Sequence, residues 1–369
     1  MGKFVNFCAG AKIDILPAER LGALLVNVPQ YAASEADVRG TRKMIEVTLP
    51  EYTAVDLGGF QFLQGMLKGG RISCDPSRPI ICNEDEVNAH PSLVIEAVLK
   101  LRPHIDMLIS LDLPVPKISD PHLQYVEFKR KLGFNLTWMR ETTRLGEKHC
   151  PEIERFVPIQ CYDLGQFTDY IEKPLLDLKF HGLSLPTRNL DPGGITLFLL
   201  KFYQMGIRKV HLLSVSNLTG LALAAYWARH FSDWCSVDAT TWRLLADKQI
   251  YMDPFDLHPI FIGQGTLFPE GLAIRCDCPW CAGKTFTGIK NTPMTDRTSV
   301  LRCHNYYVIQ KAGKEFYENA GDLVTLERCL KRRTTRQRKK IDRLIYALSV
   351  ADCMRDADIK DLESLLWKG

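Results

Sequence analysis

The fold of this chain is restricted most by a regular alternation of short apolar runs with segments of helical spacing. Because strands joined through helices run parallel, this alternation predicts βαβ units and a parallel sheet. Expected strands lie at residues 21–28, 52–57, 105–113, 155–162, 178–185, 209–215 and 234–240. Expected helices lie at residues 35–47, 90–101, 163–176, 195–205 and 218–231. So many units in 369 residues favour a closed (β/α)8 TIM barrel over an open doubly wound sheet.

The chain is apolar enough, at 46% hydrophobic residues, to bury one large domain with an appendage or two domains. We predict a barrel catalytic domain over 1–270, a zinc-binding segment over 271–310, and a helical closure with a basic patch over 311–369. The last strand and helix of the barrel are expected to bracket the metal segment, with helical closure over 341–366.

The sequence shows no secretory leader, and no apolar run reaches the roughly 18 residues that cross a bilayer. We therefore expect a cytoplasmic protein without a membrane partner, and expect its twelve cysteines to be reduced.

A group of cysteines near the C-terminus predicts a metal site. Cys276, Cys278 and Cys281 form a C-x-C-x2-C run, and 22 residues separate Cys281 from His304. Three thiolates and an imidazole are the tetrahedral ligands of closed structural zinc sites. We therefore predict a structural Zn²⁺ cofactor, with free buried cysteines as the alternative. A zinc hydrolase is disfavoured because no coordination position stays open for water.

Polar residues follow several apolar runs, where a barrel carries its active site. Asp56, Asp112, Gln160 and Asp238 each come at or just after such a run. Asp56 and Asp238 are remote in sequence, and two carboxylates can divide nucleophilic and proton-transfer work when their pKa values differ. For each aspartate the alternative is a helix N-cap or a buried salt-bridge partner.

The residues after Asp56 have the features of a site for a flat ligand. Glycines let backbone amides approach a planar ring, an aromatic residue offers a stacking face, and a glutamine offers an amide. These residues are Gly58, Gly59, Phe60 and Gln61. A glycine pair after a strand is also an ordinary turn.

With these motifs together, residues 56–305 resemble the tRNA-guanine transglycosylase superfamily, enzymes that exchange guanine for a 7-deazaguanine base in a nucleic acid. The metal motif matches, with its later His304-Asn305 pair, and D-L-G-G-F-Q stands for the family loop D-S-G-G-[FY]-Q. In chain order, LDLP, a glutamine after an apolar run, a glycine-leucine step, an H-L-[FL] strand and SVDAT also match. The resemblance implies a (β/α)8 barrel with a structural zinc.

The resemblance also implies a covalent mechanism. Asp238 would attack C1′ of the target nucleotide and expel guanine, leaving a glycosyl-aspartate. Asp56 would be general acid and base for the departing and incoming bases. Two displacements at one sugar carbon retain its configuration.

A guanine-shaped slot follows from the same resemblance. Asp112 would accept hydrogen bonds from N1–H and the exocyclic amine, while Gln160 and a nearby backbone segment would read the carbonyl edge. Two apolar side chains would sandwich the ring. The residues expected to bind the base are Asp112, Gln160, Gly182, Leu183, Leu213, Gly58, Gly59, Phe60 and Gln61.

Three departures from the family pattern bear on the substrate. Leu57 replaces the loop serine, and Ser214 and Ser216 replace glycines after the H-L-[FL] strand. These changes narrow the pocket floor, so we expect a small 7-cyano or 7-aminomethyl substituent on the incoming 7-deazaguanine.

The polymer is expected to be DNA, with tRNA as the alternative, because the chain departs from the tRNA enzymes in its opening residues, in the segment ATTWRLLADKQ after Asp238, and in its C-terminal part. The tRNA alternative is a modification of queuosine or archaeosine type. A DNA enzyme would need a strand-opening partner, since the target base must leave its stack. Family members commonly form homodimers. The alternative from another class is a non-catalytic subunit that only positions nucleic acid.

A basic run over residues 328–343 predicts contact with the nucleic-acid backbone. It holds nine basic residues and one acid, Asp342. Such a run can dock a polyanion, whereas the alternative is a solvated helix face. The residues expected to contact phosphates are Arg332, Arg333, Arg336, Lys339 and Lys340.

Overall fold

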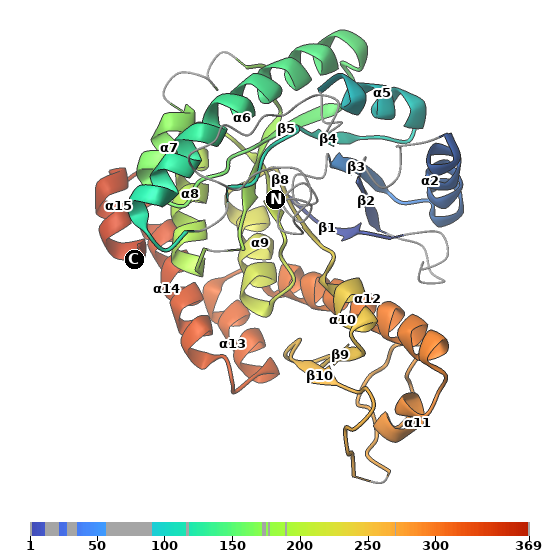
Figure 1. The fold of residues 1–369 in the computed structure, drawn as a ribbon. Coiled ribbons are helices and arrows are strands. Elements are labelled where there is room, and N and C mark those ends of the chain that lie inside the picture. The colour runs from blue at the N-terminus through green and yellow to red at the C-terminus, as the bar shows by residue number, and fades with distance from the viewer. Residues whose placement is uncertain are drawn as a thin grey trace. The chain divides into compact units, whose positions relative to one another are not determined.

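Eight strands form one closed barrel in chain order, β1 to β8, in the computed structural model (Figure 1). The structure describes residues 2–11, 22–27, 35–56, 91–115, 118–171, 175, 178–188, 190–269 and 271–367. The strands are β1 (Lys3–Ala9), β2 (Ala23–Asn27), β3 (Tyr52–Asp56), β4 (Met107–Ile109), β5 (Glu154–Pro158), β6 (Gly182–Pro186), β7 (Lys209–Leu213) and β8 (Trp234–Ala239). The predicted (β/α)8 class is confirmed.

Helices alternate with these strands and then follow them. Those between strands are α2 (Glu35–Thr48), α5 (Pro91–Leu101), α6 (Pro121–His149), α7 (Leu164–Tyr170), α8 (Pro192–Gln204) and α9 (Leu218–His230). After β8 come α10 (Thr241–Asp247), α11 (Phe286–Lys290), α12 (Met294–Asn319), α13 (Leu323–Arg333), α14 (Arg338–Cys353) and α15 (Ile359–Leu366). None of the described helices is both long and apolar enough to cross a membrane.

The first barrel strand, β1, was not predicted. Its sequence, KFVNFCA, carries Asn6 within the otherwise apolar residues 4–9, but that side chain is 9% exposed and donates to the carbonyl of Ile309 on α12. Parallel pairing of β1 with β8 closes the barrel, matching Phe7 with Asp238.

The last barrel strand lies before the metal segment. The eighth strand, β8, ends at Ala239, before the metal-site cysteines. The segment after β8 forms a separate antiparallel pair, β9 (Ile250–Met252) and β10 (Pro259–Phe261).

Short polar residues start the helices that follow the strands. Asp163, Asp191 and Asn217 are the N-caps of α7, α8 and α9, and each side chain accepts a backbone N–H three residues on. Such caps satisfy donors that a helix start leaves unpaired. These caps fix where α7, α8 and α9 begin.

The chain divides into two compact units. One contains Met1–Gly22, Leu190–Arg208 and Leu212–Gly369, and the other contains Ala23–Asn189 and Lys209–His211. In the first unit, α12 is a long helix with two attachments. His304 lies near its middle, and six residues later Gln310 donates to the carbonyl of Asn6 on β1 at 3.1 Å. The domain boundaries drawn from sequence stay a prediction.

Candidate functional site

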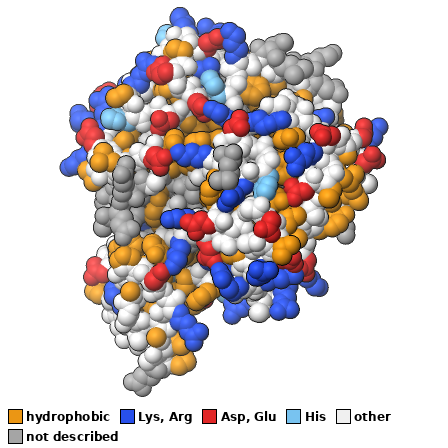
Figure 2. All heavy atoms as spheres, turned by 180° about the vertical axis from the view of Figure 1, so that it is seen from behind, with side chains coloured by type: hydrophobic (Ala, Val, Ile, Leu, Met, Phe, Trp, Pro, Cys, Tyr) orange, Lys and Arg blue, Asp and Glu red, His pale blue; other side chains and the backbone are white. Residues whose placement is uncertain are grey.

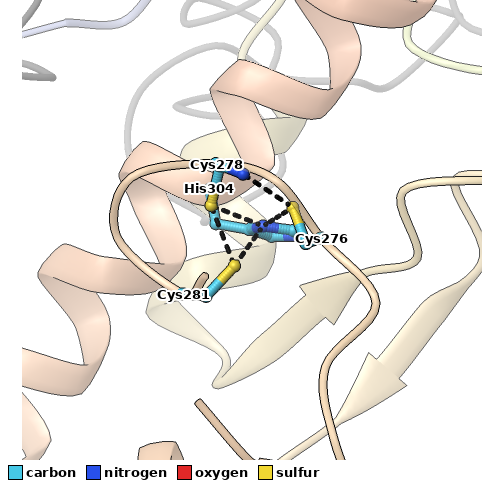
Figure 3. A group of neighbouring side chains, drawn as sticks. All are labelled: Cys276, Cys278, Cys281 and His304. Atoms are coloured by element: carbon cyan, nitrogen blue, oxygen red, sulfur yellow. Dashed lines mark hydrogen bonds between the residues drawn. The ribbon is translucent and has the colours of Figure 1, made fainter. Parts of the chain in front are cut away.

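The four predicted metal ligands lie together. Cys276, Cys278, Cys281 and His304 each offer a ligand atom within 4.8 Å of the others, and all but Cys276 are buried (Figure 3). Cys278 and Cys281 come from one tight turn, in which Ala282 N–H donates to the Cys278 carbonyl. This group could hold a metal ion such as zinc, whose preferred donors are thiolate sulfur and imidazole nitrogen.

The imidazole of His304 has the tautomer that a metal ligand needs. Its Nε2 lies 2.7 Å from the carbonyl oxygen of Met252, which only accepts, so Nε2 carries the proton. Nδ1 then presents its lone pair to the three sulfurs, at 3.3–3.4 Å. Fixing the second ring nitrogen in this way is the usual support of a metal-bound histidine. The residues present therefore fit a structural zinc.

Asn305, next to His304, is hydrogen-bonded to β9, the strand that ends with Met252. Its Oδ1 accepts from Met252 N–H at 2.9 Å, and its Nδ2 donates to the Ile250 carbonyl at 3.0 Å. Tyr251, between these residues, stacks on the His304 ring with centroids 3.9 Å apart. The histidine-asparagine pair thus fixes β9 beside the metal-binding group.

Asp112 and Gln160 are brought together as predicted. Asp112 lies three residues after β4 and Gln160 two residues after β5, and each is 5% exposed. The Nε2 amide of Gln160 donates to the Asp112 carboxyl group. Burial raises the pKa of Asp112 to about 7, with the Asp56 charge adding to the rise and the Gln160 hydrogen bond opposing it. A buried carboxyl whose ionisation changes near neutrality is a feature of functional sites.

Two buried side chains of α6 support the segment that carries Asp112, and sequence reasoning missed both. Asn135 accepts from Leu113 N–H at 2.6 Å and donates to the Leu113 carbonyl at 3.1 Å. Lys131, 1% exposed, donates to the Pro114 carbonyl at 2.7 Å and pairs with Glu127 at 2.9 Å. The signal that could have found them is the position of an Asn and a Lys on the face of the helix that packs against the core.

Asp56 is the last residue of β3 and is half-buried. Asn27, paired with it across β2 and β3, points its Nδ2 at Asp56 Oδ2 from 3.5 Å. The predicted loop that follows, with Gly58, Gly59, Phe60 and Gln61, lies outside the described residues.

Asp238 lies in β8 and is 9% exposed. Its Oδ1 accepts a hydrogen bond from the backbone N–H of Ser214, which follows β7. The predicted ring-contact residue Leu213 ends β7 and is half-buried. Both positions lie toward the C-terminal ends of their strands, the end at which (β/α)8 barrels carry their chemistry.

Gly182 and Leu183 lie inside the strand that the sequence predicts over residues 178–185. They open β6, and Gly182 pairs with Phe156, four residues before Gln160. Leu183 pairs with Val157, and the Ser184 carbonyl accepts from Ile159 N–H at 2.9 Å. The predicted contact of Gly182 and Leu183 with the base stays a prediction. Packing also requires glycine at position 182, since a Cβ there would lie 2.4 Å from the Phe156 ring. The residue that follows β6 is Thr187, 7% exposed.

The basic run divides into two parts with different surroundings. Arg333, with a side chain 8% exposed, pairs with Glu315 of α12 and donates to the carbonyls of Phe255 and Pro254 at 2.7 Å. Arg332 also pairs with Glu315, at 3.0 Å. The prediction that Arg333 contacts phosphate is therefore wrong, because its donors are committed to the fold.

The second part of the run lines a surface cavity of about 720 Å³ at the start of α14. Figure 2 shows Lys and Arg side chains gathered low on the rear face, on the side of α13 and α14. The basic residues of the cavity are Arg336, Arg338, Lys339 and Lys340. Three of them were predicted to contact the nucleic-acid backbone, and that role stays a prediction.

No protein-family model matches the chain, and no curated protein matches its sequence. (β/α)8 barrels are commonly enzymes, yet the fold by itself names no reaction. Function therefore has to follow from the side chains at the strand ends.

Proposed function

We propose that this chain is a base-exchange enzyme that replaces guanine in a nucleic acid with a 7-deazaguanine base. The Asp112–Gln160 pair carries the proposal. An ionised carboxylate accepts two hydrogen bonds side by side, which suits the N1–H and amino group of guanine, while an amide N–H suits the guanine carbonyl. Both residues are buried, so a base without matching groups would leave their remaining donors and acceptors unpaired, at a cost of about 1–3 kcal/mol each.

Asp238 is the proposed nucleophile, as the family resemblance implies. Its carboxylate oxygen forms a bond to C1′ while the C1′–N9 bond to guanine breaks. The Ser214 N–H fixes the orientation of the attacking group through Oδ1. Nucleophilic attack by the incoming base then breaks the ester and restores Asp238.

Asp56 is the proposed acid and base. It gives a proton to the departing guanine and takes one from the incoming 7-deazaguanine, so no net proton is consumed. Asn27, at 3.5 Å from Oδ2, orients this carboxyl group. The zinc ligands, with all four positions filled by protein, are assigned a structural role only.

DNA is the proposed polymer, with tRNA as the alternative. The target nucleotide has to leave its stack in either polymer, which is cheapest in single strands. A strand-opening partner is therefore part of the proposal for DNA. The incoming base is proposed to carry a 7-cyano or 7-aminomethyl group.

Covalent trapping tests the proposal. Tritiated guanine in tRNA, single-stranded DNA and double-stranded DNA is incubated with the protein, and release is measured beside a denaturation-resistant adduct. We expect the adduct with the wild type and none with Asp238→Asn. The control is Asp233→Asn, which changes an exposed aspartate just before β8 and should still form the adduct. An adduct that persists in Asp238→Asn would remove the nucleophile. Binding without release or adduct for any polymer would favour the non-catalytic subunit.

A further inference from the structure

The cavity at the start of α14 differs from its basic surroundings in that its cations are uncompensated. Among the described residues, the side chains of Arg336, Arg338, Lys339 and Lys340 make no ion pair with an acidic group. Neighbouring cations do: Lys331 pairs with Glu327 and Asp342, and Arg343 pairs with Asp191. Four unpaired positive charges around one hollow create a site for an anion.

The acid in the cavity wall is already engaged. Asp256, 8% exposed, accepts from the His258 N–H at 3.0 Å and from the Thr334 hydroxyl at 3.3 Å. Gln337 donates from its side chain to the Asp256 carbonyl at 3.2 Å, which ties the start of α14 to this loop. The basic side chains are thus mounted on a fixed wall, which lowers the entropic cost of binding.

The cavity also lies near the proposed nucleophile along the chain. Asn217, the N-cap of α9, lines it, and Asn217 is three residues after Ser214, the residue that bonds Asp238. Three residues span at most about 11 Å. One wall of the cavity is therefore within the reach of one or two nucleotides from the Asp238 carboxylate.

We infer that this cavity binds a phosphodiester of the nucleic acid, one or two linkages from the target nucleotide. The inference rests on the proposed function for the identity of the polymer. A volume of about 720 Å³ holds a nucleotide-sized group, since ligand pockets commonly measure about 300–1,000 Å³. Lysine and arginine side chains supply the ionic contacts that dominate backbone binding.

The test compares two charge-matched triple variants. Arg336→Gln, Lys339→Gln and Lys340→Gln together empty the cavity of three charges. Lys314→Gln, Lys331→Gln and Lys360→Gln together remove three exposed charges outside it. Binding of a fluorescent guanine-containing single-stranded DNA is measured over a series of salt concentrations, and thermal unfolding establishes that both variants are folded.

We expect the cavity variant to bind about tenfold or more weakly at low salt. Its salt slope should fall by about 0.7 for each phosphate that the protein no longer neutralises. The control variant should stay within about twofold. Equal weakening in both variants, or none in either, would overturn the inference. A cavity variant that does not fold is replaced by the single changes Lys339→Gln and Lys340→Gln.

A neutral methylphosphonate placed at one linkage at a time locates the phosphate that the cavity binds. The difference between wild type and cavity variant should vanish only when the neutral linkage is within two nucleotides of the target guanine. A sensitive linkage farther away would refute the adjacency. Guanine release by the wild type is measured in parallel. If the binding results are as expected but no guanine is released, only the proposed base exchange is refuted. If guanine is released but the cavity variant binds as the control does, only the inference about the cavity is refuted.

Discussion

The backbone N–H of Ser214 donates a hydrogen bond to Oδ1 of Asp238 across 3.0 Å, and Ser214 does so with a φ of 67°. This left-handed conformation is one that residues other than glycine rarely adopt. The strand end of β7 thus holds a strained turn whose amide is aimed at the carboxylate of the next strand. Strain of this kind collects where geometry matters for function.

Substitution of Ser214 separates the strain from the hydrogen bond. Ser214→Gly keeps the N–H and relieves the left-handed penalty of about 1–2 kcal/mol, less the extra backbone entropy of glycine. We expect a free energy of unfolding that is unchanged or up to about 1 kcal/mol higher, with guanine release retained. Ser214→Val, which introduces a β-branched side chain, should lower the free energy of unfolding by about 1–2 kcal/mol. Urea unfolding measures both, and a destabilised glycine variant would contradict the strain.

The buried Asp112 should make stability depend on pH. Its pKa is raised from 3.8 to about 7, so between these values the native state holds a proton that the unfolded chain has lost. The contribution of Asp112 to stability is therefore full below pH 4 and is lost as pH rises through 7. Relative to Asp112→Asn, the wild type should lose about 2 kcal/mol between pH 5 and pH 8, measured by urea unfolding. The control Asp233→Asn should follow the wild type.

The same ionisation should control base binding. Only the carboxylate form of Asp112 accepts both guanine-edge hydrogen bonds, so affinity rises with pH until the group is ionised. We expect the dissociation constant of 7-cyano-7-deazaguanine to fall about tenfold or more from pH 5.5 to 7.5. Calorimetry at several pH values measures it. A wild type as insensitive to pH as Asp112→Asn would remove Asp112 from base recognition.

Metal removal should loosen the segment around the four ligands first. Structural zinc contributes on the order of 10 kcal/mol of apparent binding energy. We expect one zinc per chain, lost in Cys278→Ser and kept in Cys353→Ser, whose cysteine is exposed on α14. Elemental analysis gives the content, and hydrogen exchange should rise over residues 271–310 on chelation. Full zinc in Cys278→Ser would contradict the assigned ligands.

Arg333 and Arg332 should differ in what their loss does. Arg333→Ala removes the buried ion-pair partner of Glu315 and the donor to two carbonyls, so we expect about 3 kcal/mol of destabilisation. Arg332→Ala removes an exposed partner of the same glutamate and should cost about 0–1 kcal/mol. Thermal and urea unfolding compare them directly. If Arg333→Ala did not change the free energy of unfolding, the contacts of Arg333 would not stabilise the fold, and its side chain would be available to contact phosphate.

Seven of the eight strands could be read from sequence because barrel strands are buried on both faces and their runs are continuously apolar. β1 escaped because of Asn6, whose polarity is satisfied by a residue 303 positions away. The 29-residue helix α6 escaped because its buried face includes charged and polar side chains that pair only in the folded chain, such as Lys131 with Glu127.

The site was predictable where a motif fixes its own neighbours. The metal ligands and the Asp112–Gln160 contact follow from spacing and strand ends. The start of β6 was predicted four residues too early, because the apolar residues before Gly182 were read as part of the strand. Arg333 was misassigned because its partner, Glu315, lies on another helix. Charge is visible in a sequence, but the partner that cancels it is not.

The helix α12 joins two duties within six residues: His304 serves the metal group, and Gln310 holds the first barrel strand. Six residues are less than two helical turns, so a shift of the helix at His304 also moves Gln310. Removal of the metal should therefore also loosen β1, the N-terminal strand, which is far from the ligands in sequence. An empty metal site would in that way weaken the pairing of β1 with β8 that closes the barrel.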